Sequence, residues 1–253
     1  MMNTGIIITA RLGSTRLKKK HLLSVNDNPL IHYLVKRIEL EFEKEINEQN
    51  THIIIATADL PENQAFETIF NGSPKIFYGS PQNIPLRHFE CARKHHLDSI
   101  ISIDGDDILC SVEGMRSVFN AFAKGYEYVS TSNLPLGMNS SGYSRNYLEK
   151  SLESNSNQEI LETGWGRIFD QGTLHNIQIP FSKDNDILRF TLDYPEDYEF
   201  FKSIILHFGE SIYKARDEEI INYVLSNNLY SINESVTKKY WENFHTAVKK
   251  ETQ

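Results

Sequence analysis

Near its N-terminus the chain reads Gly5-Ile-Ile-Ile-Thr-Ala-Arg-Leu-Gly-Ser-Thr-Arg-Leu-Lys-Lys-Lys20. The apolar run at residues 6–8 has the length of a short buried strand, and a basic loop that contains a glycine follows it directly. Such a loop is suited to a polyanion, because small residues let backbone N–H groups approach it and cationic side chains neutralise it. The small residues here are Gly13 and Ser14, and the cationic residues that we expect to point at a ligand are Arg11, Arg16 and Lys20.

Strand-like and helix-like segments alternate through the first half of the chain. This alternation predicts an α/β fold with a mostly parallel sheet, right-handed crossovers and helices on both faces. Ligands of such sheets bind beyond the carboxyl ends of the strands, where the basic loop lies. The expected strands are 6–10, 52–57, 75–78, 100–104 and 126–130, and the expected helices are 29–45, 62–70, 86–96 and 112–124, with Ser111 as an N-cap.

The alternation lapses between residues 133 and 187, which are rich in Ser, Asn and Gly. We interpret 133–187 as an excursion from the sheet that binds an acceptor or forms a dimer interface, within a single domain of residues 1–253. After it, the pattern predicts a strand at 188–193 and helices at 196–208, 217–227 and 235–250.

Composition narrows the class of protein. A chain of 253 residues with 40% hydrophobic content can bury a large core, and a net charge of −8 argues against a nucleic-acid partner. Two cysteines, Cys91 and Cys110, do not form a disulfide framework, and we expect reduced thiols. We find no signal peptide and no apolar run long enough for a membrane span, so we expect a cytoplasmic protein with no membrane partner.

A second polar segment, Asp104-Gly105-Asp106-Asp107, follows the predicted strand at 100–104. Three carboxylates within four residues repel one another unless a cation lies between them, and oxygen ligands favour Mg²⁺ or Mn²⁺. The residues alone are equally consistent with a polar turn at a strand end.

A third segment, Arg189-Phe-Thr-Leu-Asp193-Tyr-Pro195-Glu196-Asp197-Tyr198-Glu199, lies far along the chain. Pro195 suits a first helical turn, where the helix dipole favours the acidic residues Glu196 and Asp197. Capping does not explain Asp193, which ends the predicted strand.

Together these segments resemble the cytidylyltransferases that activate acidic sugars, namely the spore-coat-polysaccharide, acylneuraminate and 3-deoxy-manno-octulosonate enzymes. The family patterns are A-R-x-G-S-x-R-L-P-x-K, G-D-x-P and R-x-T-V-D-x-P-E-D-x-E. This chain has Lys18 and Ile108 where the first two patterns have proline. The resemblance implies a Rossmann-like three-layer sandwich of the nucleotide-diphospho-sugar transferase type.

The resemblance also implies an activity, in which CMP passes from CTP to a small acidic sugar with release of pyrophosphate, for surface polysaccharide synthesis. It implies a Mg²⁺ (or Mn²⁺) cofactor held by Asp106 and Asp193, and a homodimer. By the same matches, catalysis falls to Arg11, Arg16, Lys20 and Asp106. Nucleotide binding falls to Ala10, Arg11, Gly13, Ser14, Arg16, Lys20, Gly79, Ser80 and Arg87.

One family segment, Asp-Arg-Glu-His-Val-Thr-Pro, is absent, and Glu162-Thr-Gly164-Trp165-Gly166-Arg167 occupies its neighbourhood. A phosphorylated polyol or a phosphonate is therefore an alternative acceptor. A glycosyltransferase that uses Asp104-Gly-Asp106 as an Asp-x-Asp motif, and a nucleotide-binding protein without turnover, are further alternatives. For Trp165, a substrate contact competes with a packing role.

Overall fold

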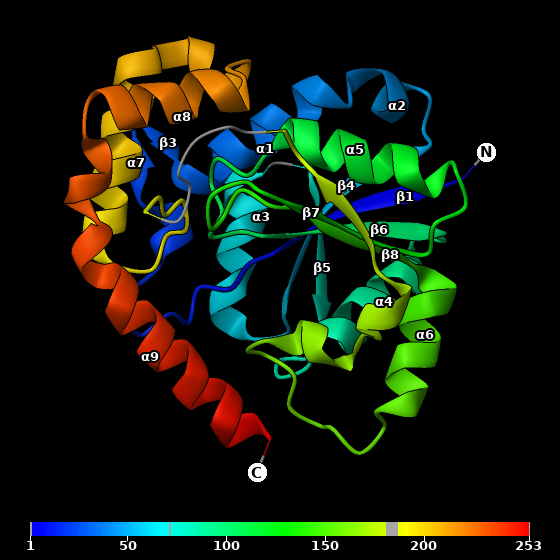
Figure 1. The fold of residues 1–253 in the computed structure, drawn as a ribbon. Coiled ribbons are helices and arrows are strands. Elements are labelled where there is room, and N and C mark those ends of the chain that lie inside the picture. The colour runs from blue at the N-terminus through cyan, green and yellow to red at the C-terminus, as the bar shows by residue number, and fades with distance from the viewer. Residues whose placement is uncertain (1, 71, 181–186, 253) are drawn as a thin grey trace.

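The computed structural model describes residues 2–70, 72–180 and 187–252. A central sheet lies between two layers of helices, with a further helical group beyond the end of its strands (Figure 1). The strand order is β5-β4-β1-β6-β8-β7-β9, and every pairing is parallel except those of β8 with β6 and β7. The strands are β1 (Thr4–Thr9), β4 (Thr51–Ala58), β5 (Lys75–Gly79), β6 (Ser99–Asp104), β7 (Tyr128–Ser132), β8 (Ser141–Ser144) and β9 (His175–Gln178), and β2 (Ser24–Val25) and β3 (Asn28–Pro29) form a separate hairpin.

Most helices connect consecutive strands. The α-helices are α1 (Leu30–Glu41), α2 (Glu43–Asn47), α3 (Ala65–Ile69), α4 (Ile84–Lys94), α5 (Val112–Phe122), α6 (Arg145–Ser154), α7 (Pro195–Phe208), α8 (Asp217–Ser226) and α9 (Glu234–Glu251). Short 3-10 helices are η1 (Lys20–Leu22), η2 (Pro61–Gln64), η3 (Trp165–Ile168), η4 (Gln171–Thr173), η5 (Gly209–Tyr213) and η6 (Leu229–Ile232). Within the described residues, no helix combines the length and the apolar character that crossing a bilayer requires.

Side-chain alternation in β1 builds both faces of the sheet. Ile6 and Ile8 pack with residues of α1, α3 and α5 in one core, and Ile7 packs with residues of α4 and α6 in another. Both faces are therefore covered, as the apolar sequence of this strand requires. A third core joins α7, α8 and Ile108 beyond the sheet, so the residue that replaces the family's proline is a buried packing residue.

The predicted α/β class and mostly parallel sheet are confirmed, and Ser111 caps α5 by accepting the N–H of Gly114. The prediction of a sheet strand at 188–193 is wrong. This segment makes only an isolated bridge, between Leu136 and Arg189, because its backbone bonds to loops beyond the sheet.

The region 133–187 also differs from a plain excursion. It supplies β8 and β9 to the central sheet, and it also holds α6; residues 181–186 of it lie outside the described part. Its short strands contain Ser, Asn and Gly rather than a continuous apolar run, so the pattern did not reveal them. Acceptor binding and dimerisation by this region stay predictions.

Candidate active site

A cavity of about 420 Å³ opens at the carboxyl ends of β1 and β6, and all three sequence motifs line it. The side chain of Lys20 is buried, with 6% of its surface exposed, and its ammonium group contacts both Asp106 and Asp193. The distance from Lys20 Nζ to Asp193 Oδ1 is 3.0 Å. Two carboxylates that are far apart in sequence therefore meet around a single cation.

One backbone hydrogen bond joins the second and third motifs, and another ties the third motif to the loop at Leu136. The N–H of Leu192 donates to the carbonyl oxygen of Asp106 at 2.9 Å, and the N–H of Phe190 donates to that of Leu136 at 2.7 Å. The turn that carries Asp106 can approach the end of β1 only because residue 105 is glycine. A Cβ at Gly105 would lie 2.8 Å from the Cβ of Ala10 and 3.0 Å from the carbonyl oxygen of Thr9. Ala10, predicted at the nucleotide site, thus lies where β1 and the Asp106 turn meet.

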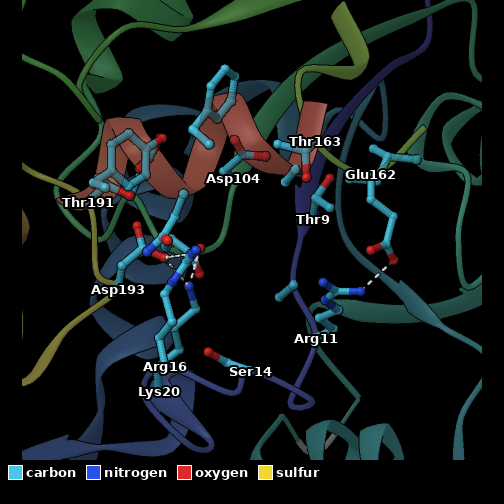
Figure 2. A pocket seen from close by; sticks show the side chains of 18 of the residues that line it. Thr9, Arg11, Ser14, Arg16, Lys20, Asp104, Glu162, Thr163, Thr191 and Asp193 are labelled. Carbon is cyan, nitrogen blue, oxygen red and sulfur yellow. Dashed lines mark hydrogen bonds and ion pairs between the residues drawn. The ribbon is translucent and has the colours of Figure 1, made fainter. Parts of the chain in front are cut away.

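Cationic side chains stand on both sides of the cavity (Figure 2). Arg16 and Lys20 lie together and reach toward Asp193, while Arg11 lies on the other side and pairs with Glu162. Ser14 lies between the two groups. Each of these cations is neutralised by a carboxylate of the protein, so an anionic ligand would have to exchange with Glu162 or share the site with the aspartates.

Backbone donors complete this wall of the cavity. Gly13 and Ser14 both line it, and within the described residues their N–H groups have no hydrogen-bond partner. Loop N–H groups without partners beside Arg and Lys side chains are suited to an anionic ligand, and the binding of one by this loop stays a prediction.

The charges shift the acidity of the site. Burial alone would raise the pKa of the Asp193 carboxyl, but Lys20 and Arg16 outweigh burial and lower it to about 2. Burial likewise lowers the pKa of Lys20, and Asp106 and Asp193 more than reverse this, so it ends above its ordinary value. Asp104 is accessible from the cavity, yet its enclosure by the fold and the charge of Asp106 raise its pKa to about 6.

Asp106 and Asp193 are also the candidate ligands for a metal ion. Within the described residues, no group of three or more His, Cys, Asp or Glu side chains is arranged to hold an ion by itself. Mg²⁺ commonly uses one or two carboxylates together with substrate phosphates, and both aspartates already contact one cation. The donor set therefore fits a hard cation that arrives with a nucleotide.

Comparisons with known proteins identify the family of this chain. A profile of the cytidylyltransferase family matches residues 5–229. The chain belongs to the cytidylyltransferase family.

An uncharacterised protein of Methanocaldococcus jannaschii is 27% identical to it over 92% of this chain and 95% of that protein. The spore coat polysaccharide biosynthesis protein SpsF of Bacillus subtilis is 26% identical over 81% of this chain and 87% of that protein. Among solved structures, a cytidylyltransferase from Leptospira borgpetersenii superimposes with a TM-score of 0.72 at 21% identity, covering 91% of this chain and 97% of that one. This last likeness shows that the family fold is shared.

Three of the residues that the sequence predicts to bind nucleotide lie around the end of β5. Arg87 is buried and lines the cavity, and its guanidinium Nε donates to the carbonyl oxygen of Ser80 at 2.8 Å. Burial and then the charge of Arg11 lower the pKa of Arg87, to about 10. Gly79 and Ser80 are not among the described residues that line the cavity; they form the turn that holds Arg87.

A wall of the cavity that the motifs did not predict comes from α9, which lies beyond the residues that match the family. Figure 1 shows this helix running from below the α7–α8 group down to the C-terminus at the bottom of the view. At its far end, Glu251 accepts the N–H of Thr163 at 2.8 Å and pairs with Arg167 at 3.2 Å. The residues of α9 that line the cavity are Tyr240, Asn243, Phe244 and Ala247.

Asp197 has a second role that helix capping did not reveal. It is fully buried and accepts the N–H of Asp193 at 2.9 Å and that of Tyr194 at 3.0 Å. It also pairs with Arg189, whose guanidinium reaches Asp193 as well. The helix dipole is therefore only part of the explanation for Asp197, because this residue also fixes the backbone that carries Asp193.

Proposed function

We propose that this chain transfers CMP from CTP to an acidic sugar and releases pyrophosphate, in the synthesis of a surface polysaccharide. The observation that carries the proposal is the contact of one ammonium group, that of Lys20, with both Asp106 and Asp193 beside a cradle of backbone N–H groups. The cytidylyltransferase family supports the choice of base, and the name of the Bacillus subtilis relative supports a role in polysaccharide synthesis.

The reaction asks for position and charge rather than for covalent chemistry. A hydroxyl of the acceptor attacks the α-phosphorus in line, the bond to the β-phosphate oxygen breaks, and pyrophosphate leaves. Arg11, Arg16 and Lys20 would hold the triphosphate and stabilise the charge that develops on pyrophosphate. Arg11 would exchange Glu162 for phosphate, because both anions compete for the same guanidinium.

The cofactor that we propose is Mg²⁺, or Mn²⁺, held by Asp106 and Asp193. When bound, the ion would supply a positive charge that polarises the α-phosphate and acidifies the attacking hydroxyl. The protein residues keep their own tasks, since Lys20 neutralises the two aspartates and the loop N–H groups orient the phosphates.

The test is pyrophosphate release from CTP, UTP and ATP with a panel of 2-keto-3-deoxy sugar acids, phosphorylated polyols and phosphonates. Release with CTP and a sugar acid supports the proposal, and release only with phosphorylated or phosphonate acceptors would replace it by another cytidylyltransfer. Nucleotide binding without release from any acceptor would contradict the proposed activity. Calorimetric titration of CTP with and without Mg²⁺ tests the cofactor separately from turnover.

A further inference from the structure

A side chamber of about 200 Å³ adjoins the active-site cavity. Asp104, Asp107 and Trp165 line both spaces, so they form the boundary between them. Serine and asparagine side chains of β6, β7 and the turn before β8 line much of the remainder.

The floor of this side chamber is a row of serines across three neighbouring strands. Ser141 of β8 pairs in register with Ser102 of β6 on one side and with Ser130 of β7 on the other. Residues in register on adjacent strands point to the same face of a sheet, so the three hydroxyl groups lie on one face.

The preceding row on that face explains why a hollow exists here. Two residues away along each strand stand Ile100, Tyr143 and Tyr128, which are buried in the core with residues of α4 and α6. Where the three strands change from these large apolar side chains to serine, the strands themselves supply no apolar side chain to fill the space above the sheet. The result is a polar recess rather than a continuation of the core.

The chemistry of the lining selects a class of ligand. Among the described residues that line the side chamber, none is Lys, Arg or His, whereas Asp104 and Asp107 are both acidic. A phosphate or carboxylate in this space would face two carboxyl groups and, among the described lining residues, no cationic side chain that could pair with it. Hydroxyl groups of a ligand, in contrast, can donate to the carboxylates and can both donate to and accept from serine.

Two polar groups are available for such bonds. In the part of the chain that the structure describes, the hydroxyl of Ser141 and the carboxylate of Asp104 have no hydrogen-bond or ion-pair partner among the protein groups. Trp165 supplies an aromatic wall, and its ring is supported by edge contacts with His88 at 5.7 Å and Tyr143 at 6.3 Å between centroids. An aromatic wall beside free hydroxyl and carboxylate groups suits a ligand with C–H and O–H surfaces together.

We propose that the side chamber binds the uncharged polyhydroxyl tail of the acceptor, while the acidic group of the acceptor stays in the main cavity near the cationic loop. This inference rests on the proposed function, because it divides one acceptor between two spaces of opposite character. By this inference the row of serines, and Ser141 in particular, selects acceptors that carry a hydroxylated exocyclic tail.

The test uses Trp165 as a reporter. The chain has two tryptophans, and Trp241 lies on α9 with 40% of its surface exposed, so Trp241→Phe leaves Trp165 as the sole source of tryptophan fluorescence. The protein is first saturated with a CTP analogue that has a methylene group between the α- and β-phosphorus atoms. It is then titrated with a nine-carbon nonulosonic acid, or with a six-carbon 3-deoxy-hexulosonic acid whose pyranose ring carries no exocyclic carbon other than that of the carboxylate.

We expect a saturable change in emission with the nine-carbon acid and at least tenfold weaker binding of the six-carbon acid. Ser141→Val and Ser141→Thr provide a matched pair, because the two side chains have the same shape and differ in one hydroxyl. Loss of one hydrogen bond should weaken the nine-carbon acid about three- to tenfold in the Val variant relative to the Thr variant. Both β-branched residues are compatible with a strand, and circular dichroism checks the fold.

Equal binding of the two acids, equal behaviour of the Val and Thr variants, or no response of Trp165 to the nine-carbon acid would each overturn the inference. Pyrophosphate release is measured in parallel to separate it from the proposed function. If both Ser141 variants release pyrophosphate equally, the proposed function stands and the proposed binding site for the tail is rejected. A hydroxyl-dependent response of Trp165 without release keeps the tail site and rejects the function.

Discussion

The backbone N–H of Leu192 donates a hydrogen bond to the backbone carbonyl of Asp106 at 2.9 Å. This one bond joins two motifs that are separated by more than a third of the chain, and it places Asp193 beside the turn that carries Asp106. Side-chain chemistry then completes the junction, because Lys20 contacts both carboxylates. The site is thus assembled from an extended segment beyond the sheet rather than from a further sheet strand.

The two aspartates should differ in their effect on stability. Asp106→Asn and Asp193→Asn should each lower pyrophosphate release by about a hundredfold or more, since each removes a charge at the reacting phosphate. Only Asp193 is deeply buried, with 3% of its side chain exposed against 28% for Asp106. We therefore expect Asp193→Asn to cost about 3 kcal/mol in urea unfolding and Asp106→Asn clearly less. Equal costs would contradict the burial argument.

Acid should remove the contribution of Asp193 to stability. Its folded pKa of about 2 lies below the ordinary value of 3.8, so the ion pair stabilises the fold fully above that ordinary value. The stabilisation, about 2 kcal/mol by linkage, is lost as pH falls from about 4 through about 2. Urea unfolding across this range should show that the difference in free energy of unfolding between wild type and Asp193→Asn becomes smaller toward pH 2. A difference that stays constant with pH would show that the ion pairs of Asp193 do not stabilise the fold.

The buried cluster around Asp197 predicts a contrast between neighbours in α7. Asp197→Ala removes the acceptor for the N–H groups of Asp193 and Tyr194 and leaves Arg189 without one of its two partners, so it should cost about 3–5 kcal/mol. Glu196→Ala, at a half-buried position in the same turn, should cost under about 1 kcal/mol. Thermal unfolding compares the stability of the two variants. Similar losses of stability would show that Asp197 contributes only through the helix dipole.

The far end of α9 should control local motion beside the cavity. Glu251→Ala removes the acceptor for the N–H groups of Glu162 and Thr163, so these amides should exchange hydrogen about tenfold faster, as loss of roughly 1–2 kcal/mol of protection implies. Glu242→Ala is the matched control, because Glu242 is exposed on the same helix and its side chain makes a weak pair with Lys238 at 3.9 Å. Mass spectrometry of residues 160–168 makes the comparison; unchanged exchange would show that Glu251 does not hold this segment.

Much of the fold follows from local sequence. Short β-branched runs alternate with amphipathic stretches, so the parallel strands and their helices were predictable, as was the inward orientation of Lys20. The three motifs identified Arg16, Lys20, Asp106 and Asp193, which the structure brings together.

Tertiary contacts determine the remainder. The antiparallel strand β8 is four residues long and contains serine and glycine, so only its position between β6 and β7 makes it a strand. Residues 188–193 are apolar enough for a strand, yet Phe190 and Leu192 find their backbone partners in loops. Glu162 and α9 reach the cavity through long-range contacts that no local pattern encodes.

A crystal structure with CTP and Mg²⁺ tests the shared nucleotide site most directly. It should place the triphosphate against the N–H groups of Gly13 and Ser14 and against Lys20, with carboxylate oxygens of Asp106 and Asp193 both about 2.1 Å from one metal ion. A triphosphate bound away from Lys20, or an ion that contacts neither aspartate, would contradict the account.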